Sequence, residues 1–180
     1  MLTGINQLEG GGTLIQVYTG NGKGKTTAAL GLAIRAAGAG LNIYIGQFIK
    51  GKDYSELAAL KKFKNIKVEQ FGRGCFIKKK PAPQDIALAN QGLNMISRVV
   101  SSGVFDLVIL DEINIALKLG LISLRDVLSL IKKTPQKIEL VLTGRSAHPK
   151  ILRLADLVSD IKEVKHYYKK GVKARKGIEF

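Results

Sequence analysis

The chain alternates between short, continuous runs of apolar residues and longer stretches in which apolar residues recur every three or four positions. Continuous runs are typical of strands buried on both faces, and the wider spacing is typical of helices with one buried side. The clearest helical spacing is that of Ile86, Ala89, Leu93, Ile96 and Val100. The predicted strands are 13–19, 41–48, 66–71, 104–110, 138–143 and 157–164, and the predicted helices lie at 25–37, 54–63, 86–100, 124–131 and 149–155.

Strands and helices alternate in this order with short connections, which predicts one α/β domain over residues 13–180. We expect a mostly parallel sheet with right-handed crossovers and helices on both faces. Ser123 precedes the helix that carries Leu124 and Val127, and Asp126 follows it three residues later, so we expect Ser123 to cap this helix. Residues 1–12 are expected to form a separate N-terminal segment.

Composition narrows the classes of protein that fit. Of the 180 residues, 46% are apolar, so the chain can bury a core. No run reaches the roughly 18 consecutive apolar residues that span a bilayer, and we expect a soluble, cytoplasmic protein without a membrane partner. One cysteine and two histidines exclude an internal disulfide and a Cys/His zinc site.

The charge is strongly positive, because 29 Lys and Arg residues against 14 Asp and Glu residues give a net charge of +15. Lysines cluster at 61–67, at 78–80 and near the C-terminal end. No stacking aromatic residues interleave with these clusters, as single-strand binders require, so a solvated surface is favoured over nucleic-acid binding. A polyanionic small molecule is compatible with the same charge.

A glycine-rich segment, called the phosphate segment below, lies between the first predicted strand and the first predicted helix. It consists of Thr19, Gly20, Asn21, Gly22, Lys23, Gly24, Lys25, Thr26 and Thr27. Glycines let successive backbone amides face inward, and the next helix adds the positive end of its dipole, so the segment suits phosphate groups. Lys25 is placed to reach phosphate oxygens and Thr26 to ligate Mg²⁺.

The phosphate segment departs from the usual G-x-x-x-x-G-K-[ST] pattern at one position, because Thr19 stands where the first glycine is expected. An ordinary glycine-rich turn that caps a helix is the alternative interpretation. The apolar strand before the segment and the helix after it favour nucleotide binding over that alternative.

Two carboxylates, Asp111 and Glu112, follow the apolar strand 104–110. Ligands of parallel α/β sheets bind at the carboxyl ends of the strands, so we expect these side chains to face the phosphate segment. We interpret both as Mg²⁺ ligands, directly or through water, without ranking them. Taken alone, the pair is also typical of a capped strand end. Together with the phosphate segment, it predicts a single-domain, three-layer P-loop NTPase-like (RecA-like) fold.

Four further blocks follow the phosphate segment in order, which makes five in all. They are Gln47-Phe48-Ile49-Lys50-Gly51, Leu110-Asp111-Glu112, Thr143-Gly144-Arg145, and an ending with Val164-Lys165-His166, Gly171-Val172-Lys173-Ala174 and Gly177-Ile178. In this combination the sequence resembles the P-loop type of corrinoid adenosyltransferase, the ATP:cob(I)alamin enzyme of vitamin B12 assembly and salvage. The resemblance covers about residues 13–180, and the ordered set of blocks is far more specific than any single one.

The resemblance implies transfer of the 5′-deoxyadenosyl group of ATP to the Co(I) of a reduced corrinoid, with release of triphosphate. Co(I) is a strong nucleophile, so the reaction needs alignment and neutralisation of the leaving group rather than a protein nucleophile or a general base. The family also binds Mg²⁺ and holds ATP in reverse relative to ordinary P-loop proteins. A homodimer and a flavoprotein-type reductant for Co(II) are further implications.

Candidate site residues follow from the motifs and from the resemblance. Lys25 and Glu112 are the candidate catalytic residues, and Thr26, Asp111 and Glu112 are the candidate metal ligands. Candidate contacts to ATP or corrinoid are Gly20, Asn21, Gly22, Lys23, Gly24, Lys25, Thr26, Thr27, Gln47, Lys50, Phe76 and Arg145. The resemblance implies an apolar or aromatic side chain that displaces the lower axial ligand of the corrin, and Phe76 is our candidate for it.

Two other functions stay open from the residues alone. A small-molecule kinase or ATPase would use the phosphate segment on the γ-phosphate and release ADP. An ATP-dependent nucleic-acid-binding protein would use the lysine clusters, and its binding would weaken steeply with salt.

Overall fold

The structure is a computed structural model that describes residues 13–74, 77 and 80–180. Its strands are β1 (Ile15–Thr19), β2 (Ile43–Lys50), β3 (Ile66–Gly74), β4 (Leu107–Asp111), β5 (Glu139–Thr143) and β6 (Leu157–Asp160). Its helices are α1 (Lys25–Gly38), α2 (Ser55–Leu60), α3 (Pro83–Ser102), α4 (Ile113–Lys118), α5 (Leu124–Lys133), α6 (Pro149–Leu152) and the 3₁₀ helix η1 (Tyr167–Lys170).

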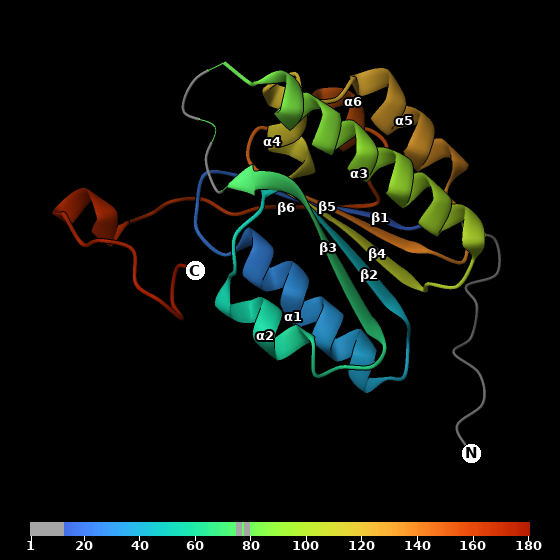
Figure 1. Cartoon of the computed structure of the whole chain (residues 1–180), viewed down its shortest axis with the longest axis horizontal. Helices are drawn as coiled ribbons and strands as arrows, with labels where there is room; N and C mark the ends of the chain where they lie inside the picture. The colour runs from blue at the N-terminus through green and yellow to red at the C-terminus, as the bar shows by residue number, and fades with distance from the viewer. Residues whose placement is uncertain (1–12, 75–76, 78–79) are drawn as a thin grey trace.

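The six strands form one sheet in the order β3-β2-β4-β5-β1-β6, and every neighbouring pair is parallel. Helices α1 and α2 cover one face of the sheet, and α3, α4, α5 and α6 cover the other (Figure 1). This arrangement confirms the predicted three-layer α/β domain, with a sheet that is entirely parallel.

The central strand β4 shows why apolar runs form such a sheet. Leu107 and Ile109 pack into the core beneath α1, and Val108 and Leu110 pack into the core beneath α3. All four side chains are at most 2% exposed. Each buried side chain of this size contributes about 1.5–3 kcal/mol, so both cores stabilise the strand.

Strand β1 lies second from one edge of the sheet. It pairs with β5 and with β6, and these two strands come from the last quarter of the sequence. Residues near the start of the domain and near its end therefore meet at one edge of the sheet, where β6 is the last strand (Figure 1).

Most predicted elements are confirmed, with shifted ends, but the last strand is shorter than predicted and two helices, α4 and η1, were not predicted. Helix α4 was not predicted; it follows Glu112, which adopts a left-handed conformation and provides no side-chain cap. The last strand ends at Asp160 rather than at Val164. Asp160 lies opposite Thr19, where β1 gives way to the phosphate segment; beyond it, Ile161 still makes backbone hydrogen bonds to Thr19 and Gly22, but the chain is no longer a regular strand.

The predicted N-terminal segment 1–12 lies outside the described residues. Within the part of the chain that the structure describes, no helix combines the length and the apolar character needed to cross a membrane.

Candidate functional site

The phosphate segment curls around the side chain of Lys25, at the start of α1. Gly24 precedes the helix with a φ of 118°, a conformation that favours glycine. The ammonium of Lys25 donates to the carbonyl of Gly22 at 2.6 Å, and the amide of Gly22 donates to the carbonyl of Ile161 at 2.7 Å. Burial, followed by the guanidinium of Arg145, lowers the pKa of the Lys25 ammonium. A phosphate group would therefore replace a bond that Lys25 makes to its own loop.

Thr19, the departure from the usual motif, has a definite structural role. Its hydroxyl accepts a hydrogen bond from the amide of Ala147 at 3.3 Å. Ala147 follows β5 in the same loop as Arg145. Thr19 thus links the phosphate segment to the loop that carries Arg145.

Asp111 ends β4 and is held by four donors. Its Oδ1 accepts from the hydroxyls of Thr26 at 2.9 Å and Thr143 at 2.7 Å. Its Oδ2 accepts from the ammonium of Lys50 at 2.8 Å and the amide of Gln47 at 3.1 Å. The strand order explains the cluster, because β4 lies between β2, which carries Gln47 and Lys50, and β5, which carries Thr143.

Gln47 was predicted to contact a ligand, and the structure places it behind the site. Its side chain is fully buried, donates to Asp111 and accepts from the amide of Gln70 at 3.1 Å. In this arrangement Gln47 fixes the position of the Asp111 carboxylate.

Glu112 turns the chain away from β4 with a φ of 61°, which is uncommon for a residue other than glycine. Its amide donates to the hydroxyl of Thr143 at 3.0 Å. Burial, followed by the neighbouring carboxylate of Asp111, raises the pKa of the Glu112 carboxyl, although nearby cations oppose this. Glu112 is therefore a carboxylate held in an environment that disfavours its charge.

A pocket of about 1080 Å³ opens beside these groups. One end is polar and is bordered by residues 22–27 together with Lys50, Glu112 and Arg145. Apolar side chains border much of the remainder: Leu30, Ile34, Ile49, Ala59, Leu60, Phe63, Ile77, Ile115, Leu119, Ile178 and Phe180. This division suits a ligand with a polyanionic part and a larger, less polar part.

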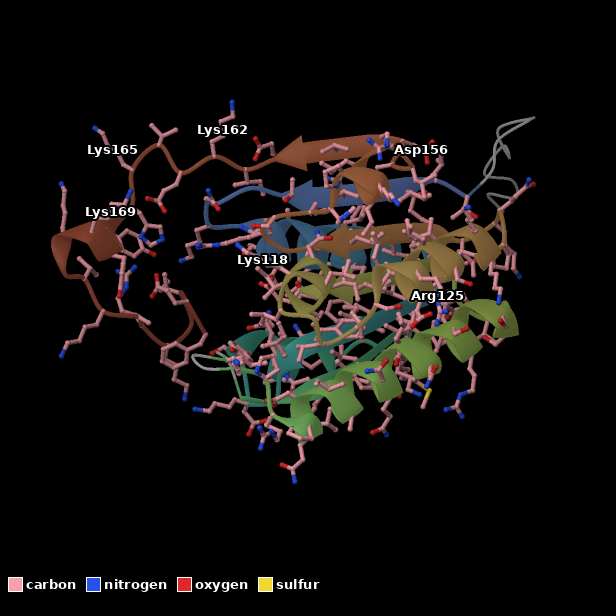
Figure 2. All side chains as sticks on the ribbon, turned by 90° about the horizontal axis from the view of Figure 1, so that it is seen from above. Lys118, Arg125, Asp156, Lys162, Lys165 and Lys169 are labelled. Atoms are coloured by element: carbon pink, nitrogen blue, oxygen red, sulfur yellow. The ribbon has the colours of Figure 1, made fainter. Side chains whose placement is uncertain are left out.

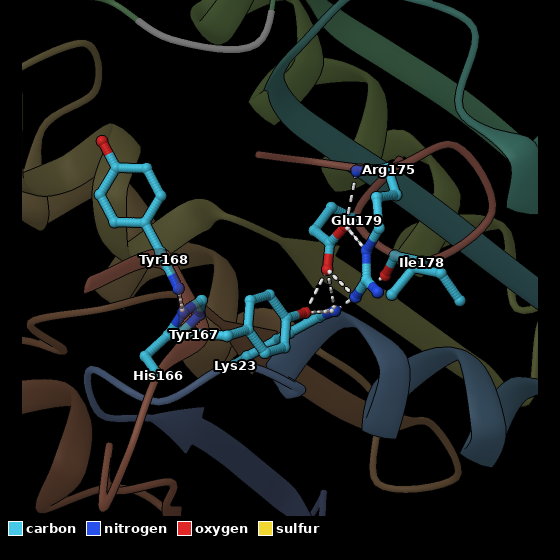
Figure 3. Close-up of polar contacts among 7 residues, drawn as sticks. All are labelled: Lys23, His166, Tyr167, Tyr168, Arg175, Ile178 and Glu179. Atoms are coloured by element: carbon cyan, nitrogen blue, oxygen red, sulfur yellow. Dashed lines mark hydrogen bonds and ion pairs between the residues drawn. The ribbon is translucent and has the colours of Figure 1, made fainter. Parts of the chain in front are cut away.

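The C-terminal segment, residues 161–180, closes one side of the pocket. The ammonium of Lys23 donates at 2.9 Å to the Tyr167 hydroxyl, to the Ile178 carbonyl and to the Glu179 carboxylate (Figure 3). Glu179 also accepts from the Tyr167 hydroxyl and, at 2.6 Å, from the amide of Arg175. The hydrogen bond from Tyr167, followed by those from Arg175 and Lys23, lowers the pKa of the Glu179 carboxyl.

The end of this segment also contacts α2. The hydroxyl of Ser55 donates to the carbonyl of Phe180 at 2.9 Å. The segment leaves β6, runs out through η1 and returns to the side of the sheet that α1 and α2 cover (Figure 1). It therefore ties the phosphate segment to α2 across the pocket.

A second pocket, of about 660 Å³, lies on the other side of the phosphate segment. It is bordered by Gly20, Asn21, Arg145, Asp160, Lys162, Glu163 and Lys169. Figure 2 shows Lys162 and Lys169 on the chain that leaves β6. Arg145 borders both pockets, so its guanidinium can serve an anion in either one.

The predicted site residues fall into three groups. Those that border the larger pocket are Gly22, Lys23, Gly24, Lys25, Thr26, Thr27, Lys50, Glu112 and Arg145. Gly20 and Asn21 border only the smaller pocket, and Gln47 and Asp111 lie behind the larger one. Phe76 lies outside the described residues, and its neighbour Ile77 borders the larger pocket.

Sequence reasoning gave no role to three residues that the structure places at the site. Thr143 ends an apolar strand with a polar side chain, which is a usable signal for a residue at the carboxyl edge of the sheet. Tyr167 and Glu179 reach Lys23 from 144 and 156 residues away, and no local pattern marks them.

Comparisons with known proteins bear on both fold and family. A family model described as ATP:corrinoid adenosyltransferase BtuR/CobO/CobP matches residues 12–180. The corrinoid adenosyltransferase of Pseudomonas aeruginosa is 37% identical over 169 residues, which cover 93% of this chain and 83% of that protein. The corrinoid adenosyltransferases of Escherichia coli and Salmonella typhimurium are 34% and 35% identical over 167 residues, which cover 93% of this chain and 85% of each.

Among solved structures, a KaiC-like protein from Pyrococcus horikoshii is similar, with a TM-score of 0.57 and 19% identity. The match covers 87% of this chain and 75% of that one. At this identity it shows the fold alone, and it confirms the predicted RecA-like architecture. The family match, in contrast, extends over the phosphate segment, the β4 carboxylates and the C-terminal segment. The chain belongs to the ATP:corrinoid adenosyltransferase family.

Proposed function

We propose that this chain transfers the 5′-deoxyadenosyl group of ATP to the Co(I) of a corrinoid and releases triphosphate. The observation that carries the proposal is the family match over residues 12–180. The shape of the larger pocket supports it, because a polar end for phosphates continues into walls that suit a less polar partner.

The reaction forms a bond between cobalt and the ribose C5′ and breaks the bond between C5′ and the triphosphate oxygen. Co(I) supplies the electron pair, and triphosphate leaves with the pair of the broken bond. The chain must hold C5′ in line with cobalt and neutralise the leaving group. Lys25 and the amides of residues 22–24 bind the triphosphate, and Arg145 adds a planar charge beside Lys25.

The nucleotide lies in reverse relative to ordinary P-loop proteins, so that its ribose rather than its γ-phosphate meets the acceptor. The apolar walls that begin beyond the polar end of the pocket support this orientation. The link from Thr19 to the loop of Arg145 is compatible with it. Phe76 contacts the lower face of the corrin in this proposal, and the position of Ile77 at the pocket wall supports a role for this loop.

Mg²⁺ fits the oxygen donors at the polar end. Among the described residues, no three His, Cys, Asp or Glu side chains gather into a ready-made metal site. Mg²⁺ typically takes one or two carboxylates together with substrate phosphates. Thr26 and Glu112 would hold it directly and Asp111 through water, since both oxygens of Asp111 accept bonds from protein donors. The ion would neutralise charge on the triphosphate.

Three features of the proposed function come from the sequence and from family membership rather than from the site. The chain acts as a homodimer in which two subunits help to close the site. It works in the cytoplasm, and a flavoprotein-type reductant converts Co(II) to Co(I).

The test mixes the protein with ATP, Mg²⁺ and chemically reduced cobalamin, and follows the light-sensitive cobalt–carbon bond and the phosphate product. We expect equal amounts of alkylated corrinoid and triphosphate. Release of ADP would support a kinase or ATPase instead. ATP turnover that changes only when DNA or RNA is added would support a nucleic-acid-binding function.

A further inference from the structure

The side chain of Lys50 lies on the opposite face of the sheet from the one that regular strand geometry predicts. Gln47 and Lys50 are three residues apart on β2, so regular alternation would place their side chains on opposite faces of the sheet. Both nevertheless donate to the same oxygen of Asp111, at 3.1 Å and 2.8 Å. The backbone of β2 must therefore depart from regular strand geometry between Gln47 and Lys50.

The reversal occurs at Ile49. Its φ is 69°, and a β-branched residue in this conformation is a genuine outlier. The register of β2 against β3 shifts between Phe48 and Lys50. Phe48 and Ile49 are adjacent, yet both belong to the core beneath α3. The chain therefore turns over at Ile49, and this turn sends Lys50 to the face that carries α1 and Asp111.

Two glycines hold the turn in place. A Cβ atom on Gly72 would overlap the carbonyl of Ile49, and a Cβ atom on Gly51 would overlap the carbonyl of Gly72. The amide of Gly51 also donates to the carbonyl of Gly74 at 2.8 Å. The backbone of β3 thus packs directly on the strained residue, and such strain persists only where the surroundings enforce it.

The ammonium of Lys50 lies where a metal ion would be expected. It is 2.8 Å from Oδ2 of Asp111 and 3.5 Å from Oγ1 of Thr26. In P-loop proteins, a hydroxyl and a carboxylate in these two positions hold the divalent metal. The Lys50 side chain is 12% exposed and borders the larger pocket, so it can also touch a ligand there.

We propose that Lys50 is the internal cation of the phosphate site. The turn at Ile49 places its ammonium between Asp111 and Thr26, where it opposes binding of a divalent ion that is not carried by polyphosphate and contacts the polyphosphate chain of the substrate. This inference rests on the proposed function for the identity of the polyphosphate, and it assigns to Lys50 a role separate from the transfer step. A lysine that only stabilised the fold would neutralise Asp111 without contacting the polyphosphate.

The first test uses Lys50→Met, which keeps the length of the side chain and removes its charge. We expect the affinity for inorganic tripolyphosphate, measured in EDTA by calorimetry, to fall about tenfold or more, as for other charge-assisted contacts. We expect the affinity for Mn²⁺ alone, measured by electron paramagnetic resonance, to rise about tenfold, because Asp111 loses its bound cation. Lys52→Met removes an exposed charge two residues away and should change neither value.

The second test addresses the turn. Gly72→Ala should displace Ile49 and produce the same two changes as Lys50→Met. Gly74→Ala is the matched control on the same strand, because a Cβ atom there meets open space, and it should bind both ligands as the unmodified protein does. Circular dichroism checks that each variant is folded, and Lys50→Gln replaces any variant that is not.

Unchanged tripolyphosphate affinity or unchanged Mn²⁺ affinity in folded Lys50→Met would overturn the inference. Neither measurement contains corrinoid or requires transfer. A protein that shows both changes but forms no cobalt–carbon bond would contradict the proposed function and leave the inference standing. A protein that forms the cobalt–carbon bond but shows neither affinity change in Lys50→Met would overturn the inference and leave the proposed function standing.

Discussion

The two neighbouring carboxylates after β4 experience opposite surroundings. Asp111 accepts four hydrogen bonds and lies behind the pocket, whereas Glu112 borders the pocket from a left-handed turn. Burial and the charge of Asp111 raise the pKa of Glu112, so this residue reduces the stability of the empty protein. Such a cost is common at sites that must later bind a cation.

Glu112→Gln should therefore stabilise the protein at about pH 7, by on the order of 1 kcal/mol. The folded state raises the pKa of Glu112, so the unmodified protein loses stability as the pH rises through that pKa, and glutamine removes the loss. The gain, measured by urea unfolding, should shrink toward about pH 4, where the carboxyl is protonated in both states. In the control Glu163→Gln, a carboxyl whose pKa is lowered by Lys169 is removed, and no gain should follow.

Lys25→Ala should weaken the binding of ATP and of tripolyphosphate by about 30-fold or more, as expected when one partner of a buried charged contact is lost. Its melting temperature should stay close to that of the unmodified protein, because among the described residues the Lys25 ammonium donates a hydrogen bond only to the carbonyl of Gly22. Lys64→Ala removes an exposed lysine that borders neither pocket and should bind normally. Normal binding by Lys25→Ala would contradict the phosphate role.

At the level of residues, the sequence was sufficient to predict a site residue where its role follows from its neighbours in the chain. Lys25 and Thr26 were predicted because a strand, a loop and a helix start follow one another in the motif, and Glu112 because an apolar strand ends at two carboxylates. All three border the pocket. The side-chain direction of Lys50 was beyond prediction, since it depends on contact between two strands at Gly72. The bonds of Lys23 to the C-terminal segment were beyond prediction because loop closure over such a distance leaves no local pattern.

Helix α5 shows how the residue before a helix stabilises its start. The hydroxyl of Ser123 accepts from the amide of Asp126 at 3.1 Å, as its position before the helix predicts. Ser123→Ala should lower the free energy of unfolding by about 1 kcal/mol, because the amide loses its partner. Urea unfolding measures this loss. Ser97→Ala, in the exposed middle of α3, should cost little or nothing, and an equal loss in both variants would remove the capping explanation.

Elements with strong periodicity were predictable, and those without it were not. The stripe of α3 and the apolar run of β4 predicted their elements because each buries one or both faces. Helix α4 was missed because Glu112 begins it from a left-handed turn without a side-chain cap. The path of residues 161–180 was missed because it is anchored by polar contacts, such as those of Glu179 to Lys23, Tyr167 and Arg175, rather than by a buried apolar face.

For the molecule as a whole, the C-terminal segment forms one wall of the pocket, and we expect the bonds of Glu179 to hold it in place. Its exposed lysines and arginines make trypsin a direct probe. Glu179→Gln weakens the bonds to Lys23 and Arg175, so cleavage after Arg175 should become severalfold faster, as followed by mass spectrometry. Glu163→Gln removes another ion pair of the same segment, to Lys169, and should leave cleavage at Arg175 unchanged. Equal cleavage rates in Glu179→Gln and Glu163→Gln would show that the bonds of Glu179 do not hold the C-terminal segment in place.

The position of β1 between β5 and β6 has a consequence for synthesis on the ribosome. The strand that leads into the phosphate segment is translated early, but its hydrogen-bonding neighbours emerge only with residues 139–160. The amide of Gly22 can form its hydrogen bond only after Ile161 has been translated. At a translation rate of about 5–20 residues per second, the nascent chain spends seconds with this strand unsheltered. A stalled or prematurely terminated product lacking the last strand would therefore be unable to capture its nucleotide and would depend on chaperones to avoid aggregation.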